Sequence, residues 1–397
     1  MEKLLEKSNR SIQYIHFPFQ RELNRKINWE WRLNGIVGAR GTGKTTLLLQ
    51  RLAQLQKEGH EVLYVRLDDL YFIDHQIYEL ADTFRKNGGK YLYMDEVHKY
   101  VGWARELKNI YDAMPELIMV FSGSSIIELT NQDADLSRRA LMYEMTGLSF
   151  REYLLIADII TLPPHSLNDI LENHIEIASG IINQIPVLKH FTTYLKTGYY
   201  PFFLEPDRDY FMTLEQVIRI VMETDLRFIE SFDIAQSKKM LTLLKVIAAS
   251  VPFKPNISKI SEKTGLHRQT VLLYFQYLEK ARMIHLINHP ERYISRLQKP
   301  DKLFLNNPNL LFVLNPDMVN TGNLRETFAL NQLIVNHEVF LHKQADFMID
   351  NKFVIEIGGK NKDNRQVRDV ENAFVFMDDI EIGHHKHIPL WLLGFLY

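Results

Sequence analysis

One glycine-rich stretch constrains this chain more than any other part of it. It reads Gly38-Ala39-Arg40-Gly41-Thr42-Gly43-Lys44-Thr45-Thr46. A short apolar run precedes this stretch and Leu47–Leu49 follow it, so the expected local order is strand, loop, helix. The spacing from Gly38 to Thr45 is G-x-x-x-x-G-K-[ST], which is typical of a phosphate-binding loop.

The residue types of this loop suit a bound anion. Glycines at positions 38, 41 and 43 let the backbone turn tightly and aim several N–H groups at one phosphate. The helix that begins there adds the positive end of its dipole. We expect Lys44 to reach the β- and γ-phosphates of a nucleotide and the Thr45 hydroxyl to bind Mg²⁺. A plain glycine turn is the alternative, and the Lys-Thr pair argues against it.

Further strands and helices follow in alternation. Strand patterns occupy residues 61–67, 90–94 and 117–121, and helical patterns occupy residues 47–57, 76–86 and 103–113. This alternation predicts an α/β fold, with a parallel sheet that carries helices on both faces. Polar clusters follow the strands at Asp68-Asp69, Asp95-Glu96 and Ser122–Ser125. Ligands of such sheets bind beyond the carboxyl ends of the strands, which is where these clusters should lie.

The polar clusters supply candidates for catalysis. We expect Asp95 to hold Mg²⁺ and Glu96 to orient and deprotonate the attacking water. Ser124, with Ser122, is a candidate to hydrogen-bond the γ-phosphate or the water, and a Ser/Gly turn is the alternative. Arg139, with Arg138, is a candidate source of positive charge for the transferring phosphate, and a surface ion pair is the alternative.

Four segments together resemble a known family. They are the loop itself, Met-Asp-Glu-Val-His-Lys at 94–99, Phe-Ser-Gly-Ser-Ser at 121–125 and Leu-Ser-Phe-Arg-Glu-Tyr at 148–153. They resemble predicted archaeal and bacterial AAA+ ATPases, in which an ATPase core precedes a carboxy-terminal domain of unknown function. The resemblance implies an AAA+ fold that binds ATP and Mg²⁺, and AAA+ proteins often form homo-oligomeric rings. The family's Gly-Gly-x-Pro turn stands here as Gly198-Tyr199-Tyr200-Pro201, without the second glycine.

Length and composition bound the remaining expectations. A chain of 397 residues is long enough for two or three domains. Its net charge of −2 gives no global field for nucleic acid or membrane, so such a partner needs a local patch. The absence of cysteine excludes disulfides, thiolate zinc sites and cysteine nucleophiles. Residues 1–10 lack a secretion signal's apolar core, and the apolar runs are shorter than the ~20 residues of a membrane span. We therefore expect a cytoplasmic protein without a membrane partner.

The middle of the chain reads as helical. Residues 151–235 are expected to form a lid over the nucleotide. Residues 236–292 follow with helices at 257–263 and 267–280 around a glycine turn, and then an apolar run at 283–287. That order is typical of a winged helix-turn-helix. Candidate DNA contacts are Lys259, His267, Arg268 and Gln269, supported by Lys254, Lys263, Lys280, Arg282 and Arg292. A protein contact or a further lid is the alternative.

The last part, residues 293–397, differs in pattern from the rest. Strands are expected at 303–306, 310–314, 345–349, 352–357 and 389–396, with a helix around Arg325 and Glu326. Glu326, Asp346 and Glu356 are candidates for a second metal site. This arrangement resembles the PD-(D/E)XK nuclease fold, although the lysine nearest to Glu356 is displaced to Lys360. A domain that keeps the fold without cleaving is the alternative to a nuclease.

The sequence thus predicts four domains. They are an AAA+ core at 1–150, a helical lid at 151–235, a winged helix-turn-helix at 236–292 and a nuclease-like domain at 293–397. The predicted function is Mg²⁺-dependent ATP hydrolysis that drives a change of domain arrangement, with DNA as a candidate partner. A nucleotide-gated switch or binding scaffold that hydrolyses ATP slowly is the alternative.

Overall fold

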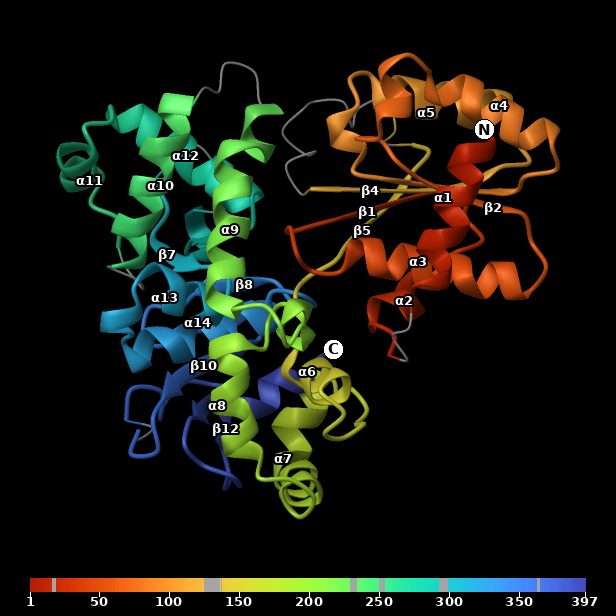
Figure 1. Ribbon diagram of the computed structural model, residues 1–397. Coiled ribbons are helices and arrows are strands. Elements are labelled where there is room, and N and C mark those ends of the chain that lie inside the picture. Colours follow the sequence, from red (N-terminus) through yellow and green to blue (C-terminus); the bar gives the residue numbers. More distant parts are fainter. Residues whose placement is uncertain are drawn as a thin grey trace. The chain divides into compact units, whose positions relative to one another are not determined.

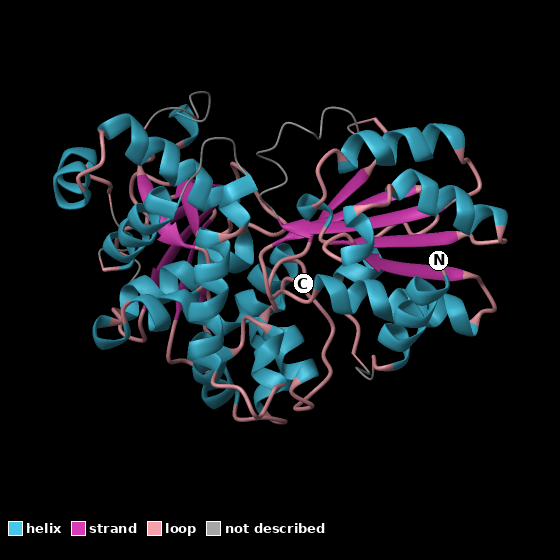
Figure 2. Ribbon diagram, turned by 45° about the horizontal axis from the view of Figure 1, so that its top comes forward, coloured by secondary structure: helices cyan, strands magenta, loops and turns pink. Residues whose placement is uncertain are grey.

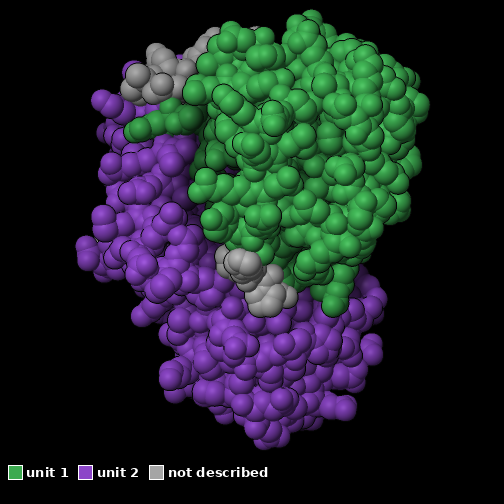
Figure 3. All heavy atoms as spheres, turned by 45° about the vertical axis from the view of Figure 1, so that its right-hand side comes forward, with its two compact units in different colours: residues 1–147, 223–232 green, residues 148–222, 233–397 purple. Residues whose placement is uncertain are grey.

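The chain forms two units, coloured separately in Figure 3. The first unit comprises Met1–Gly147 and Glu223–Phe232, and the second comprises Leu148–Met222 and Asp233–Tyr397. The computed structural model describes residues 1–15, 19–124, 136, 138–228, 234–249, 254–292, 299–362 and 365–397. The first unit is therefore built from two separate pieces of the sequence.

Among the described residues of the first unit, five strands form a parallel sheet in the order β2-β3-β4-β1-β5. The strands are β1 (Leu33–Gly38), β2 (Val62–Arg66), β3 (Tyr91–Asp95), β4 (Ile118–Ser124) and β5 (Leu141–Glu144). Side chains of one strand point alternately to two cores, so that Leu92 and Met94 face one core while Tyr91 and Tyr93 face the other. Both faces are buried, which explains why the central strands read as nearly continuous apolar runs.

Helices cover both faces of this sheet, as Figures 1 and 2 show. They are α1 (Glu2–Gln13), α2 (Leu23–Lys26), α3 (Lys44–Lys57), α4 (Ile77–Lys86) and α5 (Trp103–Ala113), with 3₁₀ turns η1 (Leu70–Ile73), η2 (Val97–Lys99) and η6 (Asp225–Phe228). Leu80 of α4 and Leu107 of α5 pack in one core, and Leu48 of α3 packs in the other. The predicted parallel α/β sheet is confirmed, and β5 is a strand that the sequence pattern did not predict.

A second, mixed sheet lies in the second unit. Its order is β12-β11-β10-β9-β8, with β10, β11 and β12 parallel and β8, β9 and β10 antiparallel. The strands are β8 (Val339–Leu341), β9 (Phe347–Ile349), β10 (Phe353–Gly358), β11 (Ala373–Met377) and β12 (His387–Pro389). Helix α14 (Thr321–Leu333) packs against β10, and its Phe328 lies in the same core as Phe347 of β9.

Three helices of the predicted lid share this core. They are α6 (Phe150–Ile156), α7 (Leu167–Ile182) and α8 (Val187–Thr197). Phe150 packs edge-on against Phe395, at the other end of the unit's sequence. Ser149 caps α6 together with Glu152, and both the Ser149 hydroxyl and Arg151 Nε donate to the Tyr397 carbonyl, at 2.7 and 2.9 Å. The Leu-Ser-Phe-Arg-Glu-Tyr segment therefore anchors α6 to the carboxy-terminal part of the second unit.

The rest of the second unit contains the residues of the predicted helix-turn-helix, which stays a prediction. Its elements are η5 (Pro201–Leu204), α9 (Tyr210–Glu223), α10 (Ile234–Ala248), α11 (Ile257–Thr264), α12 (Arg268–Lys280), β6 (Ile284–Ile287), η7 (Pro290–Arg292), β7 (Lys302–Leu305), α13 (Pro308–Leu314) and η8 (Pro316–Met318). Gly265 ends α11 with a left-handed φ of 67°, as a helix C-cap requires. Strands β6 and β7 pair antiparallel, so the expected strand at 303–306 belongs with the helix-turn-helix.

Two expected strands are helical instead. Residues 310–314 lie in α13, because Asn307 accepts a hydrogen bond from Leu310 N and Pro308 fits the first helical turn. Within residues 389–396, Pro389 is the last residue of β12. The chain then continues as the 3₁₀ helix η9 (Leu390–Phe395), in which every residue is buried. Short apolar runs do not distinguish a buried strand from a buried helix, which explains both errors.

The packing also groups the predicted domains differently. The pairing of β6 with β7 crosses the predicted boundary between residues 292 and 293. Helices α6 to α8 share a core with the carboxy-terminal sheet rather than forming a separate body. The position of these helices over a nucleotide stays a prediction.

We expect Asn309→Ala to lower the free energy of unfolding of the second unit by about 3 kcal/mol or more. The fully buried Asn309 amide donates to the carbonyls of Tyr194 and Leu195, at 3.2 and 2.8 Å. Its oxygen accepts from Tyr199 N at 2.9 Å and from the Tyr210 hydroxyl. Removing the side chain leaves several buried groups unpaired, at about 1–3 kcal/mol each.

Urea unfolding of the full chain, followed by circular dichroism, measures this loss. The matched control is Asn183→Ala, at an exposed position of the same unit, which should change stability by less than ~0.5 kcal/mol. Equal midpoints for the two variants would contradict the structural role given to Asn309.

Candidate nucleotide site

The glycine loop joins β1 to α3 as the sequence predicts. Gly43 sits before α3 with a φ of 96°, and Gly41 has a φ of 84°, both in the left-handed region. A Cβ on Gly38 would lie 2.2 Å from the Met145 carbonyl oxygen, so no larger residue fits there. These glycines let the loop fold tightly around the space in front of α3.

Lys44 is the buried cation of this loop. Its side chain is turned back so that Nζ donates to the carbonyls of Gly38 and Ala39, at 2.9 and 2.8 Å. Burial lowers the pKa of Lys44, although nearby Glu96 and Asp95 raise it. The carbonyls that hold the buried Lys44 ammonium are neutral, so its hydrogen-bond partners do not balance its positive charge. A phosphate group therefore fits this position well.

Asp95, at the carboxyl end of β3, is fixed by four hydrogen bonds. It accepts from the Thr45 hydroxyl at 2.6 Å, from the Tyr64 hydroxyl at 2.8 Å, from Glu96 N at 3.0 Å and from the Ser122 hydroxyl. The predicted pair of Thr45 and Asp95 is thus in direct contact, and hydroxyl and carboxylate oxygens are ligands that Mg²⁺ prefers. Ser122 holds Asp95 instead of pointing to a phosphate, and Tyr64 is a contact that the sequence did not reveal.

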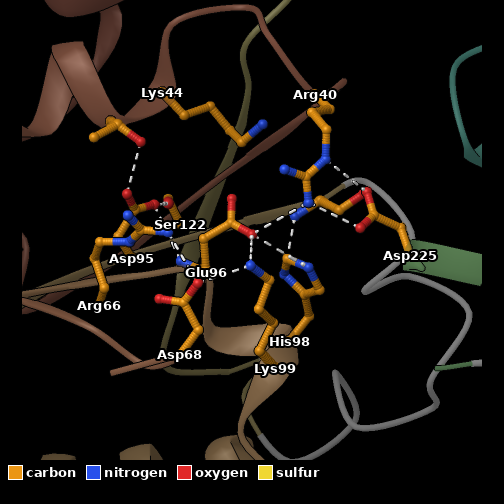
Figure 4. Close-up of polar contacts among 12 residues, drawn as sticks. Arg40, Lys44, Arg66, Asp68, Asp95, Glu96, His98, Lys99, Ser122 and Asp225 are labelled. Atoms are coloured by element: carbon orange, nitrogen blue, oxygen red, sulfur yellow. Dashed lines mark hydrogen bonds and ion pairs between the residues drawn. The ribbon is translucent and has the colours of Figure 1, made fainter. Parts of the chain in front are cut away.

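Glu96 follows Asp95 in a left-handed backbone conformation, with a φ of 58°. Three cationic or imidazole groups surround its Oε2 atom: Lys99 Nζ at 3.2 Å, His98 Nε2 at 3.5 Å and Arg40 Nη2 at 3.6 Å (Figure 4). Burial alone would raise the pKa of Glu96, but these neighbours and Lys44 lower it below the usual value. Glu96 therefore stays ionised, as a general base must be.

Ser124 contributes to the site through its backbone. Its N–H donates to His98 Nδ1 at 3.4 Å, which links the end of β4 to the neighbour of Glu96. Burial lowers the pKa of His98, so the imidazole is neutral near pH 7. The predicted role for the Ser124 hydroxyl stays a prediction, and Ser125 lies outside the described residues.

Arg40 makes a contact that the sequence did not predict. Its Nη2 and Nε donate to the two oxygens of Asp225, at 2.9 and 3.2 Å. Asp225 belongs to η6, in the second sequence piece of the first unit, and is fully buried. Burial lowers the pKa of Arg40, but the hydrogen bonds and charge of Asp225 more than reverse this effect. A separation of 185 residues left no local sequence signal for this pair.

Arg139 does not reach this site. It forms a two-point ion pair with Asp112, at 2.9 and 2.8 Å, and its carbonyl accepts from Trp31 Nε1. Asp112 ends α5 and Trp31 precedes β1, so both lie at the amino edge of the parallel sheet. The predicted catalytic role for Arg139 is therefore wrong, and the ion pair that was the alternative is what forms. Arg138 is exposed.

Two segments of the sequence match the profiles of known protein families. Residues 30–154 match the sequence profile of a family described as AAA domain. This segment is similar to AAA domains. It contains the loop, Asp95 and Glu96, and the matched range ends inside α6. Residues 188–318 match a second profile, described as a domain of unknown function, DUF8612. The first unit has an α/β fold, in which a parallel sheet lies between helices and the glycine loop follows β1.

Solved structures and curated proteins add little to this. DnaA bound to AMPPCP and single-stranded DNA shows 14% identity and a TM-score of 0.31, over 69% of this chain and 87% of that chain. AMPPCP-bound DnaA from Aquifex aeolicus shows 14% identity and a TM-score of 0.28, over 70% and 88%. The S. cerevisiae Hsp104–ADP complex shows 15% identity and a TM-score of 0.30, over 70% and 39%. At such TM-scores these structures support no statement about this chain. No curated protein matches the sequence.

The three carboxy-terminal acids lie outside the segment that matches the AAA profile. Glu326 lies on α14, Asp346 precedes β9 and Glu356 lies in β10. Burial raises the pKa of all three, and the charge of Asp346 raises the pKa of the other two further. Asp346 accepts from Ile357 N at 2.8 Å. The three carboxylates therefore lie close enough for their charges to interact, and they are called the carboxylate cluster below.

Lysines occupy this carboxylate cluster. Lys362 Nζ lies 2.5 Å from Glu356, and Lys302 Nζ lies 2.5 Å from Glu326. The side chain of Lys362 runs past Gly358, where a Cβ would lie 2.4 Å from it, while the predicted Lys360 is exposed. Lys362 is therefore the lysine of this cluster. No three acidic or histidine side chains in the described ranges are arranged to hold a metal ion, so the predicted second metal site is not formed.

The predicted DNA-contacting residues lie at the surface of the helix-turn-helix. Lys259 of α11 is exposed, as are Arg268 and Gln269 at the start of α12. His267 caps α12 by accepting from Gln269 N at 3.4 Å. Across the part of the chain that is described, no helix is both long and apolar enough to cross a bilayer.

We expect Asp346→Asn to stabilise the second unit at pH 8 but not at pH 5. The raised pKa values mean that the folded chain binds these protons more tightly than the unfolded chain does. Stability therefore falls as the pH rises from the usual carboxyl range through the raised values. Removing the charge at this position should therefore stabilise the folded chain only at the higher pH.

Thermal unfolding of the full chain at both pH values measures this effect. Asp369→Asn, at an exposed position, is the control and should leave both midpoints unchanged. An Asp346→Asn variant that is less stable at pH 8 would show that the ion pairs outweigh the repulsion among the acids.

Proposed function

We propose that the first unit binds ATP with Mg²⁺ and hydrolyses it. The observation that carries this proposal is the convergence of three groups at one sheet edge: the buried Lys44, the Thr45–Asp95 pair and the ionised Glu96. On binding, the Lys44 ammonium exchanges its carbonyl partners for the β- and γ-phosphates. Mg²⁺ would be held through Thr45 and Asp95 and would bring positive charge to the phosphates.

The chemical step needs a base beside the γ-phosphate. Glu96 accepts a proton from water, the water oxygen bonds to the γ-phosphorus, and the bond from that phosphorus to the bridging oxygen of ADP breaks. The four hydrogen bonds to Asp95 fix the end of β3 and therefore the backbone that carries Glu96. Preorganisation of this kind lowers the cost of orienting the reacting groups.

A slowly hydrolysing switch is the second candidate function. The specific observation in its favour is that Lys99, His98 and Arg40 all lie close to Glu96 Oε2. Ion pairs that hold the base compete with the attacking water for the same oxygen. In a switch, ATP would alter the arrangement of the domains, and hydrolysis would only reset it.

We expect Lys44→Ala to abolish ATP binding and Glu96→Gln to retain binding while losing turnover. The first variant removes the cation that meets the phosphates, and the second removes only the proton acceptor. Calorimetry measures binding, and phosphate release measures turnover, with a kcat loss of about 10²-fold or more in Glu96→Gln. Lys57→Ala, exposed on the same helix, is the control.

The outcomes separate the two functions. Robust turnover that depends on Glu96 supports the enzyme. Tight ATP binding with negligible turnover in the unaltered chain supports the switch. Unchanged ATP binding in Lys44→Ala would contradict both.

We also propose that the helix-turn-helix contacts DNA. The exposed basic residues at α11 and at the start of α12, followed by an antiparallel strand pair, support this. Lysine ammonium groups contact two of the three carboxylates, and this supports a binding scaffold rather than a nuclease for the carboxy-terminal part. A homo-oligomer stays a proposal, for which gel filtration with ATP is the test.

We expect the double charge reversal Lys259→Glu and Arg268→Glu to weaken binding to duplex DNA and to reduce the slope of log K against log salt. Each phosphate contact that is lost should lower the slope by about 0.9. Fluorescence anisotropy over a salt series measures both quantities. Lys189→Glu, at another site of the second unit, is the charge control, and equal slopes for all proteins would contradict DNA contact at these helices.

A further inference from the structure

We propose that Arg40 supplies positive charge to the γ-phosphate from within the loop, and that Asp225 positions it for that task. This inference rests on the proposed ATP hydrolysis. The Arg40 guanidinium takes the role that the sequence suggested for Arg139, which is to bring positive charge to the transferred phosphate. Asp225, which belongs to no sequence motif, also receives a role.

The position of Arg40 in the loop brings its guanidinium close to Glu96. Arg40 follows Gly38 and Ala39 in the loop whose backbone would surround the phosphates, and its guanidinium is turned toward the end of β3 (Figure 4). Nη2 lies 3.6 Å from Oε2 of Glu96. A base that directs water at the γ-phosphorus must lie close to that phosphate. A cation beside this base is therefore close to the γ-phosphate as well.

The contact with Asp225 fixes the orientation of the Arg40 guanidinium. The two carboxylate oxygens bind Nε and Nη2 in a two-point arrangement that fixes the plane of the guanidinium. Arginine carries five N–H donors, so this contact leaves other donors for a phosphate oxygen. The Asp225 side chain is fully buried, and a buried carboxylate without a cation is strongly disfavoured. Asp225 therefore holds Arg40 firmly rather than as a loose surface pair.

The role proposed for Arg40 differs from the role proposed for Lys44. Lys44 begins α3 and donates to carbonyls inside the loop, whereas Arg40 reaches out of the loop to Glu96. Two cations from one loop then act on different parts of the nucleotide. Lys44 serves ATP and ADP alike through the β-phosphate, and Arg40 serves the phosphate that is transferred.

A purely structural ion pair is the competing explanation, and nucleotide binding distinguishes the two. We expect Arg40→Ala to weaken a β,γ-methylene ATP analogue by at least about 5-fold while changing the Kd of ADP less than about 2-fold. In turnover, we expect kcat to fall by about 10²–10³-fold, as for other electrostatic groups at a reacting oxyanion. Guanidinium chloride at millimolar concentrations should restore part of the lost kcat.

Asp225 is tested as a positioning residue. Asp225→Asn keeps the shape but weakens the grip on Arg40, so kcat should fall by about 10-fold with the Kd of ADP unchanged. Arg40→Lys keeps a charge without the two-point geometry and should fall between the wild type and Arg40→Ala. The control is Arg85→Ala, which removes an arginine that contacts Asp82 and Glu116 at 2.8 Å and should leave kcat unchanged.

All measurements use the full chain, with thermal unfolding as a check of folding. An unchanged kcat in Arg40→Ala would overturn the inference. A parallel loss of kcat, ADP affinity and thermal stability, without rescue by guanidinium, would also overturn it, because that pattern belongs to a structural ion pair. If the wild type binds ATP without turnover, the proposed hydrolysis fails. The difference between the ATP analogue and ADP then still decides whether Arg40 contacts the γ-phosphate.

Discussion

The candidate nucleotide site of the first unit depends on the hydrogen bonds of the Asp95 carboxylate. Its partners come from the loop helix through Thr45, from β2 through Tyr64 and from β4 through Ser122. A buried carboxylate needs such donors, and they in turn draw three neighbouring strand ends and the loop into one cluster. The backbone of Glu96 follows directly, so the hydrogen bonds of Asp95 also set the position of Glu96.

Sequence reasoning was sufficient where the chemistry is local. The spacing from Gly38 to Thr45 defines a loop within a few residues, and Asp95-Glu96 closes a strand whose apolar run is visible in the sequence. Parallel strands bring their carboxyl ends to one edge, which predicted that the polar clusters after the strands would lie near the loop. The parallel sheet and its glycine loop were therefore predictable from the sequence, while the roles of these residues remain proposals.

Sequence reasoning failed where a contact joins distant segments. Asp225 lies far along the chain from Arg40, and nothing around it marks a nucleotide site. Arg139 follows an acidic stretch in the sequence, yet its place at the amino edge of the sheet follows only from the direction of α5. Lys362 replaces Lys360 because Gly358 leaves space for a side chain that arrives from a later turn. Each of these outcomes depends on tertiary packing that no local pattern encodes.

The divided sequence of the first unit has a consequence for its synthesis. Asp225 emerges from the ribosome only after Leu148–Met222, which belongs to the other unit. The loop, β1 and β3 can fold early, but Arg40 cannot pair with Asp225 until the intervening helices have been synthesised. A fragment that ends with the AAA match at residue 154 would never receive it. The first unit of this chain is thus completed only after Leu148–Met222 of the second unit has been synthesised.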